Sequence, residues 1–378
     1  MRKAAILSSV LTLFALAIQS RAAEQPQSFA SMRELIKASG TSGGLVVHLG
    51  NGDGTATADL VANDRLLVHG LYRDHDQLRK ARKHLQQRKL YGKASAQHWN
   101  QPYLPYTDNL VNLLVADELG EIPMKEVLRA LAPRGVAYIK SGATWKKTVK
   151  PWPAEIDEWT HYLHGPDNNA VAEDDVVGVP KHVQWIGNPK YARGHEQLAS
   201  VSAMVSAEGR LFSIVDMGVT GDIRLPARWR LVARDAFNGL VLWTRNIKQW
   251  HSHLHGFRSG PADLPFRLAA VGSRVYVSTG DDNPVLALDA ASGKVMVSYP
   301  GTEHTRQVIR VEDKLILLAG TSQADVRRNG GDAAKRTIIA AKAETGAILW
   351  RREVSVDSLL PLVVSGDAGL YQTHDHLV

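Results

Sequence analysis

Three groups of residues in this 378-residue chain have types and spacings that suit chemistry. The first is a glycine cluster, Gly50, Gly52 and Gly54, which directly follows an apolar run of strand length at 45–49. Glycines in a strand-to-helix turn let the backbone approach a ligand closely, with the N-terminus of a helix beyond them. The cluster therefore indicates a nucleotide-type binding loop.

The other two groups are histidines. His251, His253 and His255 alternate, so in an extended strand their side chains share one face and can hold a transition metal. His161 and His164 are three residues apart and share a face if their segment is helical, which is a spacing that suits a metal. Simple exposure of the first group, and polar packing of the second, are the alternatives.

The elements around the glycine cluster alternate between strand and helix. Apolar runs predict further strands at 65–71, 94–98, 110–115 and 136–139, and helices at 55–62, 77–87 and 124–131. This alternation predicts a parallel sheet with helices on both faces. Residues 28–145 are therefore expected to form a Rossmann-like α/β domain, and the proline-bearing stretch 146–158 a linker.

This domain resembles the class I S-adenosylmethionine-dependent methyltransferases over residues 43–139. The motifs that support the resemblance are Val47-His-Leu-Gly-Asn-Gly-Asp-Gly54, Leu104-Pro-Tyr-Thr-Asp108 and the helix, Pro-Gly turn and strand that follow Glu126. The resemblance implies S-adenosylmethionine as the ligand of the glycine cluster and, if the loop bends back, of Asp74.

Three positions depart from the family pattern. Where the family usually has acidic residues, this chain has His48 before the glycines, Tyr72 at the end of the second strand and Asn112 in the fourth. Without the carboxylate at the second strand, the ribose hydroxyls lose a charge-assisted acceptor worth ~1.5–3 kcal/mol. We therefore expect a degenerate site, with methyl transfer as an alternative function.

The N-terminus has the pattern of a signal peptide. Arg2 and Lys3 precede an apolar run at 4–18, and small residues end at Ala22. That run is too short to cross a bilayer comfortably. Residues 1–22 are expected to be a cleaved signal that exports the chain to the periplasm or cell envelope, leaving no transmembrane span. An uncleaved anchor is the alternative.

Composition limits the chemistry and the partners. The chain has no cysteine, so disulfides, thiolate metal sites and thiol nucleophiles are excluded. The formal net charge is +7, and three of the positive charges lie in the signal segment. A basic helix at 77–87 is most simply a solvated face. Nucleic acid is not an expected partner of an exported protein.

An internal repeat dominates the second half of the chain. The sequence Leu231-Val-Ala-Arg-Asp-Ala-Phe-Asn-Gly-Leu-Val-Leu-Trp243 recurs in related form at 285–297 and 338–350. The turn glycines of the three copies, Gly239, Gly293 and Gly346, are 54 and 53 residues apart. A hairpin precedes each copy, and two hairpins per ~50 residues make one four-stranded propeller blade.

The repeats resemble those of quinoprotein-like propellers, which include pyrroloquinoline quinone (PQQ) alcohol dehydrogenases and the non-enzymatic lipoprotein BamB. In that family the tryptophan packs over the glycine turn of the adjacent blade, which implies a structural role for Trp243 and Trp350. Residues 159–378 are expected to contain three blades and the start of a fourth, an incomplete propeller whose closing blades lie beyond Val378. The combination of both domains resembles large proteins of planctomycete-type bacteria.

The sequence thus favours an exported propeller protein that binds envelope proteins or peptides through its blades. The first alternative is an oxidoreductase that uses PQQ with calcium, and the second is a methyltransferase. No calcium ligand set matches a motif of the dehydrogenases, and their vicinal cysteine pair is absent.

Overall fold

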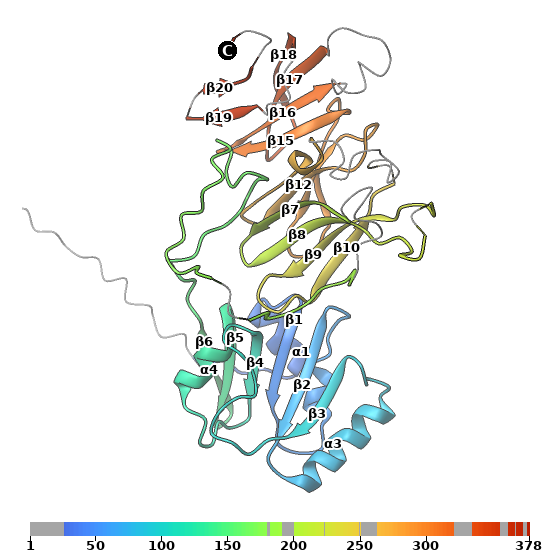
Figure 1. Cartoon of the computed structure of the whole chain (residues 1–378). Coiled ribbons are helices and arrows are strands. Elements are labelled where there is room, and N and C mark those ends of the chain that lie inside the picture. The colour runs from blue at the N-terminus through green and yellow to red at the C-terminus, as the bar shows by residue number, and fades with distance from the viewer. Residues whose placement is uncertain are drawn as a thin grey trace, which may run out of the picture.

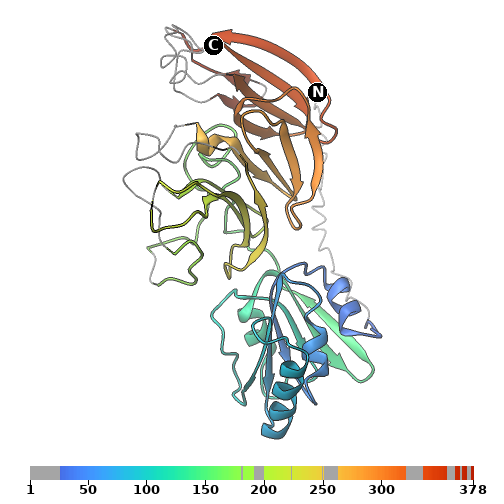
Figure 2. The ribbon, with the colours of Figure 1, turned by 90° about the vertical axis from the view of Figure 1, so that its right-hand side faces the viewer.

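The computed structural model describes residues 26–179, 182–190, 200–222, 224–248, 250, 263–320, 335–355, 362–366, 368–372 and 376–378. An α/β domain lies at one end of the molecule, and antiparallel sheets extend away from it (Figures 1 and 2). Within the described ranges, no helix is both long and apolar enough to cross a membrane.

The α/β domain is built on one six-stranded sheet in the order β3-β2-β1-β4-β5-β6. The first five strands pair in parallel, and β6 pairs with β5 in antiparallel fashion. The strands are β1 (Gly44–Leu49), β2 (Leu66–Tyr72), β3 (Ala94–His98), β4 (Val111–Ala116), β5 (Leu131–Ser141) and β6 (Thr144–Val149). The order 3-2-1-4-5 is that of a Rossmann-like domain, and it confirms the predicted fold.

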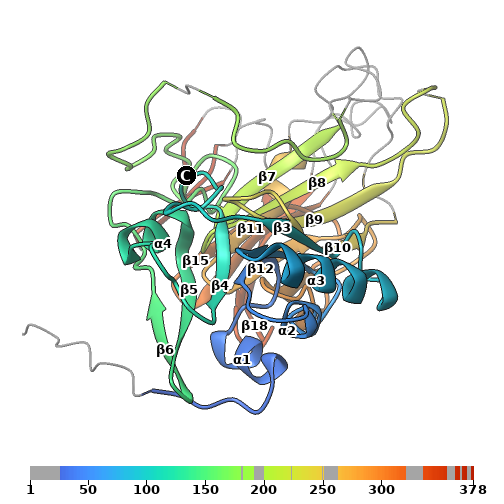
Figure 3. The ribbon, with the colours of Figure 1, turned by 90° about the horizontal axis from the view of Figure 1, so that it is seen from below.

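Helices cover both faces of this sheet (Figure 3). The helices are α1 (Met32–Ser39), α2 (Thr55–Asp59), α3 (His75–Gln87) and α4 (Met124–Ala130). Leu35, Ala58 and Leu85 of the first three helices pack on one face, and Val127 of α4 packs on the other. These buried positions follow the apolar spacing of an amphipathic helix in α3, which buries Leu78, Ala81 and Leu85.

The far edge of the sheet differs from the prediction. β5 begins at Leu131 and includes Pro133, which stands at a register shift against β4, so the expected Pro-Gly turn is part of a strand. Residues 146–149, assigned from sequence to the linker, lie in β6. The hairpin forms because Gly142 supplies the turn at φ +61° and Trp145 is buried on the sheet.

Three four-stranded antiparallel sheets follow, with their strands in sequence order, and we call them blades 1 to 3. Blade 1 contains β7 (Val201–Ala207), β8 (Arg210–Asp216), β9 (Trp229–Asp235) and β10 (Val241–Asn246). After the short helix η1 (Leu264–Arg267), blade 2 contains β11 (Leu268–Val271), β12 (Arg274–Ser278), β13 (Val285–Asp289) and β14 (Val295–Tyr299). Blade 3 contains β15 (Thr305–Val311), β16 (Lys314–Gly320), β17 (Lys335–Lys342) and β18 (Ile348–Ser355).

The blades pack face to face, as alternating strands require. Phe212 and Trp243 of blade 1 share a core with Val275 of blade 2, and Tyr276 on the opposite face of blade 2 packs with Leu317 of blade 3. Beyond blade 3 lies a hairpin, β19 (Val363–Ser365) and β20 (Ala368–Leu370), whose residues share a core with that blade. Three propeller blades and the first strand pair of a fourth are therefore present, as the repeat predicts.

A non-helical segment, Trp159–Asn168, runs across the first strands of the blades, and we call it the strap. Its backbone or side chains bond in turn to Ser206 of β7, Ala270 of β11 and Arg310 of β15. At its end, Asn168 donates to the carbonyl of Leu362, just before β19. The strap therefore links every blade that the structure describes.

Candidate functional site

The glycine cluster lies at the carboxyl ends of β1 and β2, where a Rossmann-like sheet binds its ligand. The N–H of Gly50 donates to the Leu71 carbonyl at 2.9 Å, and that of Gly52 donates to Gln77 Oε1 at 3.2 Å. The Asn51 N–H donates to Asp117 Oδ2 at 3.2 Å. The Gly50 bond continues the pairing of β1 with β2, and side chains of the protein itself occupy the loop amides of Asn51 and Gly52.

A buried chain of hydrogen bonds fills the space beneath this loop. His48 Nδ1 lies 2.7 Å from Thr57 Oγ1, which lies 2.6 Å from the Tyr72 hydroxyl. All three side chains are buried, and burial raises the pKa of Tyr72, so its hydroxyl is neutral. A Cβ on Gly50 would lie 2.9 Å from the Tyr72 ring. The tyrosine therefore turns inward under the glycines and does not offer an acceptor to a ribose.

Asp74 acts as the N-cap of α3. Its Oδ1 accepts the N–H groups of Asp76 at 2.9 Å and Gln77 at 2.8 Å. The cavity beside it has a volume of about 200 Å³ and is lined by Asn51, Arg73 and Trp99, among others. Sites for drug-sized ligands occupy ~300–1,000 Å³. With the loop amides and Asp74 already bonded, the residues present do not fit S-adenosylmethionine.

The opposite edge of the sheet, at the amino ends of its strands, is docked on blade 1. Asn112 Nδ2 donates to Asp235 Oδ2 at 2.6 Å, across the boundary between the domains. Asn112 Oδ1 accepts the Leu45 N–H at 2.8 Å and Asn238 Nδ2 at 2.7 Å. Asn112 thus joins the start of β1 to the Asp-Ala-Phe-Asn-Gly turn of blade 1. We call this group of contacts the docked edge.

The docked edge tolerates little change. Gly44 has φ +109°, and a Cβ there would lie 2.0 Å from Asn112 Oδ1. Asp235 also accepts the N–H groups of Phe237 and Asn238, which fix the turn. Burial raises the pKa of Asp235, and these donors together with Asn112 Nδ2 offset part of that effect.

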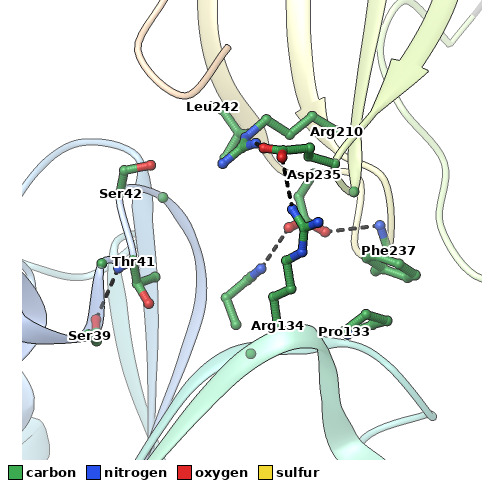
Figure 4. Close-up of a pocket in the computed structure, with 15 residues that line it drawn as sticks. Ser39, Thr41, Ser42, Pro133, Arg134, Arg210, Asp235, Phe237 and Leu242 are labelled. Atoms are coloured by element: carbon green, nitrogen blue, oxygen red, sulfur yellow. Dashed lines mark hydrogen bonds and ion pairs between the residues drawn. The ribbon is translucent and has the colours of Figure 1, made fainter. Parts of the chain in front are cut away.

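A polar cavity of about 180 Å³ lies beside these contacts, between the two domains. Figure 4 shows Arg134 reaching from the first domain toward Arg210 and Asp235 of blade 1. Arg134 Nη1 lies 3.3 Å from Glu208 Oε1, and its guanidinium stacks 4.7 Å above the Trp152 ring. Charged groups of both domains line this cavity and pair with one another, so it is part of the docked edge.

The repeat residues form a regular series of contacts between blades. Trp243 Nε1 donates to the Ala290 carbonyl at 2.9 Å, and a Cβ on Gly293 would lie 2.6 Å from its ring. Trp185, from the segment before blade 1, makes the same two contacts. Its Nε1 donates to the Ala236 carbonyl at 3.0 Å, and a Cβ on Gly239 would lie 2.4 Å from its ring. Each ring therefore requires glycine in the turn that it covers.

The third contact in this series uses different residues. Val297 stands at the tryptophan position and covers Gly346 at 3.1 Å from the Cβ position. The Tyr299 hydroxyl supplies the missing donor, to the Ala343 carbonyl at 2.5 Å. Trp350, at the equivalent position of blade 3, is 48% exposed.

Sequence reasoning missed Trp185 and the role of Asn112. Trp185 lies 58 residues before Trp243, whereas the equivalent positions 243, 297 and 350 are 54 and 53 residues apart, so its spacing is a little longer than the repeat. Asn112 was noted only as a departure from a family pattern, because its partners are more than 120 residues away in the chain.

The histidines divide into two cases. His251, His253 and His255 lie outside the described residues, so their metal site stays a prediction. His161 and His164 lie in the strap, which is not helical. His161 Nε2 accepts the Arg310 N–H at 3.0 Å, and His164 Nε2 lies 2.6 Å from Asp157 Oδ2. Among the residues that the structure describes, no three of His, Asp and Glu are placed to hold a metal ion.

One family model matches part of the chain. Residues 227–375 match the family model described as outer membrane protein assembly factor BamB. A search of curated proteins found no match. A protein of Methanococcus maripaludis assigned as an S-adenosyl-L-methionine-dependent methyltransferase shares 19% identity, with a TM-score of 0.28, over 30% of this chain and 54% of its own.

Two further solved structures give similar values. A protein of Galdieria sulphuraria assigned as a sarcosine dimethylglycine methyltransferase is 20% identical, with a TM-score of 0.26, over 29% of this chain and 44% of its own. The geranyl diphosphate C-methyltransferase of Streptomyces coelicolor is 16% identical, with a TM-score of 0.26, over 28% and 43%. This chain thus spans about half or less of each. Strand order and blade architecture therefore describe a Rossmann-like domain joined to propeller blades that are similar to those of the BamB family.

Proposed function

We propose that this protein is a binding scaffold of the cell envelope, in which the blades hold partner proteins and the first domain braces blade 1. The observation that carries the proposal is the contrast within the first sheet. Its ligand-binding edge is filled by the protein's own groups, whereas its opposite edge is bonded to blade 1 through Asn112. A domain used in this way contributes position and stability to the blades, without methyl transfer.

The outer strands of the blades offer surfaces for partners. Met296 of β14 is 56% exposed and Leu349 of β18 is 42% exposed, and each strand is the last in its sheet. An edge strand has unpaired N–H and C=O groups that an extended peptide segment can join by strand addition, with apolar side chains for specificity. The similarity of these blades to those of an outer membrane assembly factor supports a protein partner.

The envelope location rests on the first 22 residues, which have the composition of a signal peptide. Fractionation of the producing cells, with N-terminal sequencing of the protein, tests this part. We expect the protein in the periplasmic or envelope fraction, beginning at Ala23. A full-length protein in the cytoplasm would contradict the proposal.

Calorimetric titration with S-adenosylmethionine tests the structural role of the first domain. The purified chain is expected to release no binding heat, because the loop amides and Asp74 are already bonded. Binding in the micromolar range would show a working cofactor site and overturn the scaffold proposal. A parallel titration with PQQ and calcium tests the oxidoreductase alternative, and tight stoichiometric binding with a quinone absorbance would support that alternative instead.

A further inference from the structure

Three arginines, two of them buried and Arg336 half-buried, lie at the starts of β11, β15 and β17. Arg267 ends η1 just before β11, Arg306 is the second residue of β15, and Arg336 is the second residue of β17. The first strands of the blades lie next to one another, because β7 contacts β11 and β11 contacts β15. The arginines lie at the end of the blade stack where these strands begin. This end is opposite to the strap, which bonds near the carboxyl ends of β7 and β15. We call these three side chains, with Asp263 and Asp281, the arginine cluster.

Two carboxylates satisfy two of the arginines. Arg267 is 2% exposed; its Nη2 lies 2.7 Å from Asp263 Oδ2, and its Nη1 lies 3.1 Å from Asp281 Oδ1. Arg306 is 9% exposed and lies 3.3 Å from Asp281 Oδ2 and 3.7 Å from Asp263 Oδ2. Its Nε also donates to the Gly320 carbonyl at 2.9 Å. Both acids are therefore shared between the same two guanidinium groups.

Among the residues that the structure describes, no carboxylate pairs with Arg336 in this way. Arg336 pairs in the sheet with Gly320, and Arg306 donates to the carbonyl of that same glycine. The two arginines therefore lie at the same end of blade 3. The Arg336 Nε is buried without a hydrogen bond. Burial lowers the pKa of the Arg336 guanidinium, and the nearby charge of Asp263 offsets this only in part. A buried N–H group without an acceptor is costly, because it has lost its water and gained no bond in exchange, whereas the rest of this half-buried guanidinium stays open to a ligand.

The charge of the arginine cluster is thus one positive unit in excess. We propose that the cluster binds one carboxylate group, which Arg336 holds through its guanidinium and which makes the site neutral. A guanidinium fork matches a carboxylate in a planar, two-bond geometry. A phosphate has a charge of about −1.5 to −2 and would leave excess negative charge beside Asp263 and Asp281. The carboxylate can belong to a small acid or to an acidic side chain of a bound protein.

Thermal unfolding of the purified chain with matched probes, at constant ionic strength, tests this proposal. The probes are acetate against acetamide, a capped peptide with one glutamate against its glutamine version, and inorganic phosphate. We expect a carboxylate probe to raise the midpoint of unfolding and its neutral counterpart to leave it unchanged. A response to acetate indicates a small acid as the ligand, and a response to the glutamate peptide alone indicates a protein side chain.

The variant Arg336→Met assigns the effect to the site. The variant removes the excess charge, so in the absence of any ligand we expect it to melt at a higher temperature than the natural protein. We also expect it to bind the carboxylate probe ~10–100-fold more weakly. Arg352→Met, an exposed position on β18 of the same sheet, is the matched control and should respond like the natural protein. The proposal is overturned if no carboxylate probe shifts the midpoint, if phosphate acts as strongly as acetate, or if Arg336→Met responds undiminished.

Discussion

Both edges of the first sheet contain glycines at positive φ, but only the amino edge contacts blade 1. At the carboxyl edge, Gly52 has φ +107°, and a Cβ there would meet nothing within 4 Å. At the amino edge, Gly44 has φ +109°, and a Cβ there would collide with Asn112. Gly50 and Gly54 at the carboxyl edge are also tightly packed, but against Tyr72 and Ala81 of the same domain. Only at the amino edge does the packed glycine lie against a residue that bonds to blade 1.

The largest expected effect comes from Asn112→Asp, which tests the docked edge. The new carboxylate would lie beside Asp235 and could no longer donate to it, leaving a buried and a half-buried acid in contact. We expect a loss of ~3–5 kcal/mol in the free energy of unfolding, measured with urea. Asn51→Asp makes the same change at the exposed carboxyl edge and should stay within ~0.5 kcal/mol. Equal losses from both variants would remove the distinction between the edges.

Acid offers a second test, on the link between the strap and the blades. Burial lowers the pKa of His161 to about 4, and the nearby charge of Arg310 acts in the same direction. The neutral ring accepts the Arg310 N–H at Nε2. Unfolded, a histidine titrates near 6.5, so the unfolded chain takes up the proton first. Stability is therefore full above pH ~6.5 and is lost as the pH falls toward 4, by ~3 kcal/mol.

The variant His161→Gln keeps an acceptor and cannot titrate in this range. Urea unfolding at a series of pH values should show a smaller slope between pH ~6.5 and 4 for this variant. Identical slopes for the variant and the natural protein would show that His161 is not buried in its neutral form.

The glycines of the two edges give a direct comparison of intermediate size. Gly44→Ala and Gly52→Ala both place a side chain at nearly the same positive φ, which alone costs ~1–2 kcal/mol. Only Gly44→Ala also pushes Asn112 away from its partners, so we expect it to lose ~2 kcal/mol more than Gly52→Ala in thermal unfolding. A smaller loss for Gly44→Ala would mean that the docked edge can separate freely.

The smallest effect is expected from Tyr72→Phe at the carboxyl edge. It removes one hydroxyl from the buried chain with His48 and Thr57, and should lose ~1 kcal/mol in urea unfolding. If the variant instead gains affinity for S-adenosylmethionine in calorimetry, the Tyr72 hydroxyl blocks a binding site that is otherwise intact. The carboxyl edge would then still be a cofactor site.

The parts of the fold that follow from local pattern could be predicted from the sequence. Strands such as Leu45–Leu49 and the repeat around Gly239, Gly293 and Gly346 show their spacing within a few dozen residues. β6 was assigned to the linker because prolines follow it at 151 and 153, and Trp145 is its one buried residue. Alternating polarity in so short a strand is hard to separate from an extended connector.

The contacts that define the candidate site depend on partners far apart in the chain. Asn112 and Asp235 are 123 residues apart, and the strap residue His161 and Arg310 are 149 apart. No periodicity links such pairs, so a single sequence gives the residue types without their pairing. Trp185 comes nearest to an exception, since it lies 58 residues before Trp243, only a few residues more than the repeat.

A double-mutant cycle between Asn112 and Asp235 tests the docked edge most directly. Asn112→Ala, Asp235→Ala and the double variant are compared with the natural protein by urea unfolding. If the two side chains join the domains as described, the effects are not additive and the coupling energy is ~1.5–3 kcal/mol, as for a hydrogen bond to a charged group. Additivity within ~0.3 kcal/mol would mean that the first domain is not held on blade 1 through this pair, and would contradict its role as a brace.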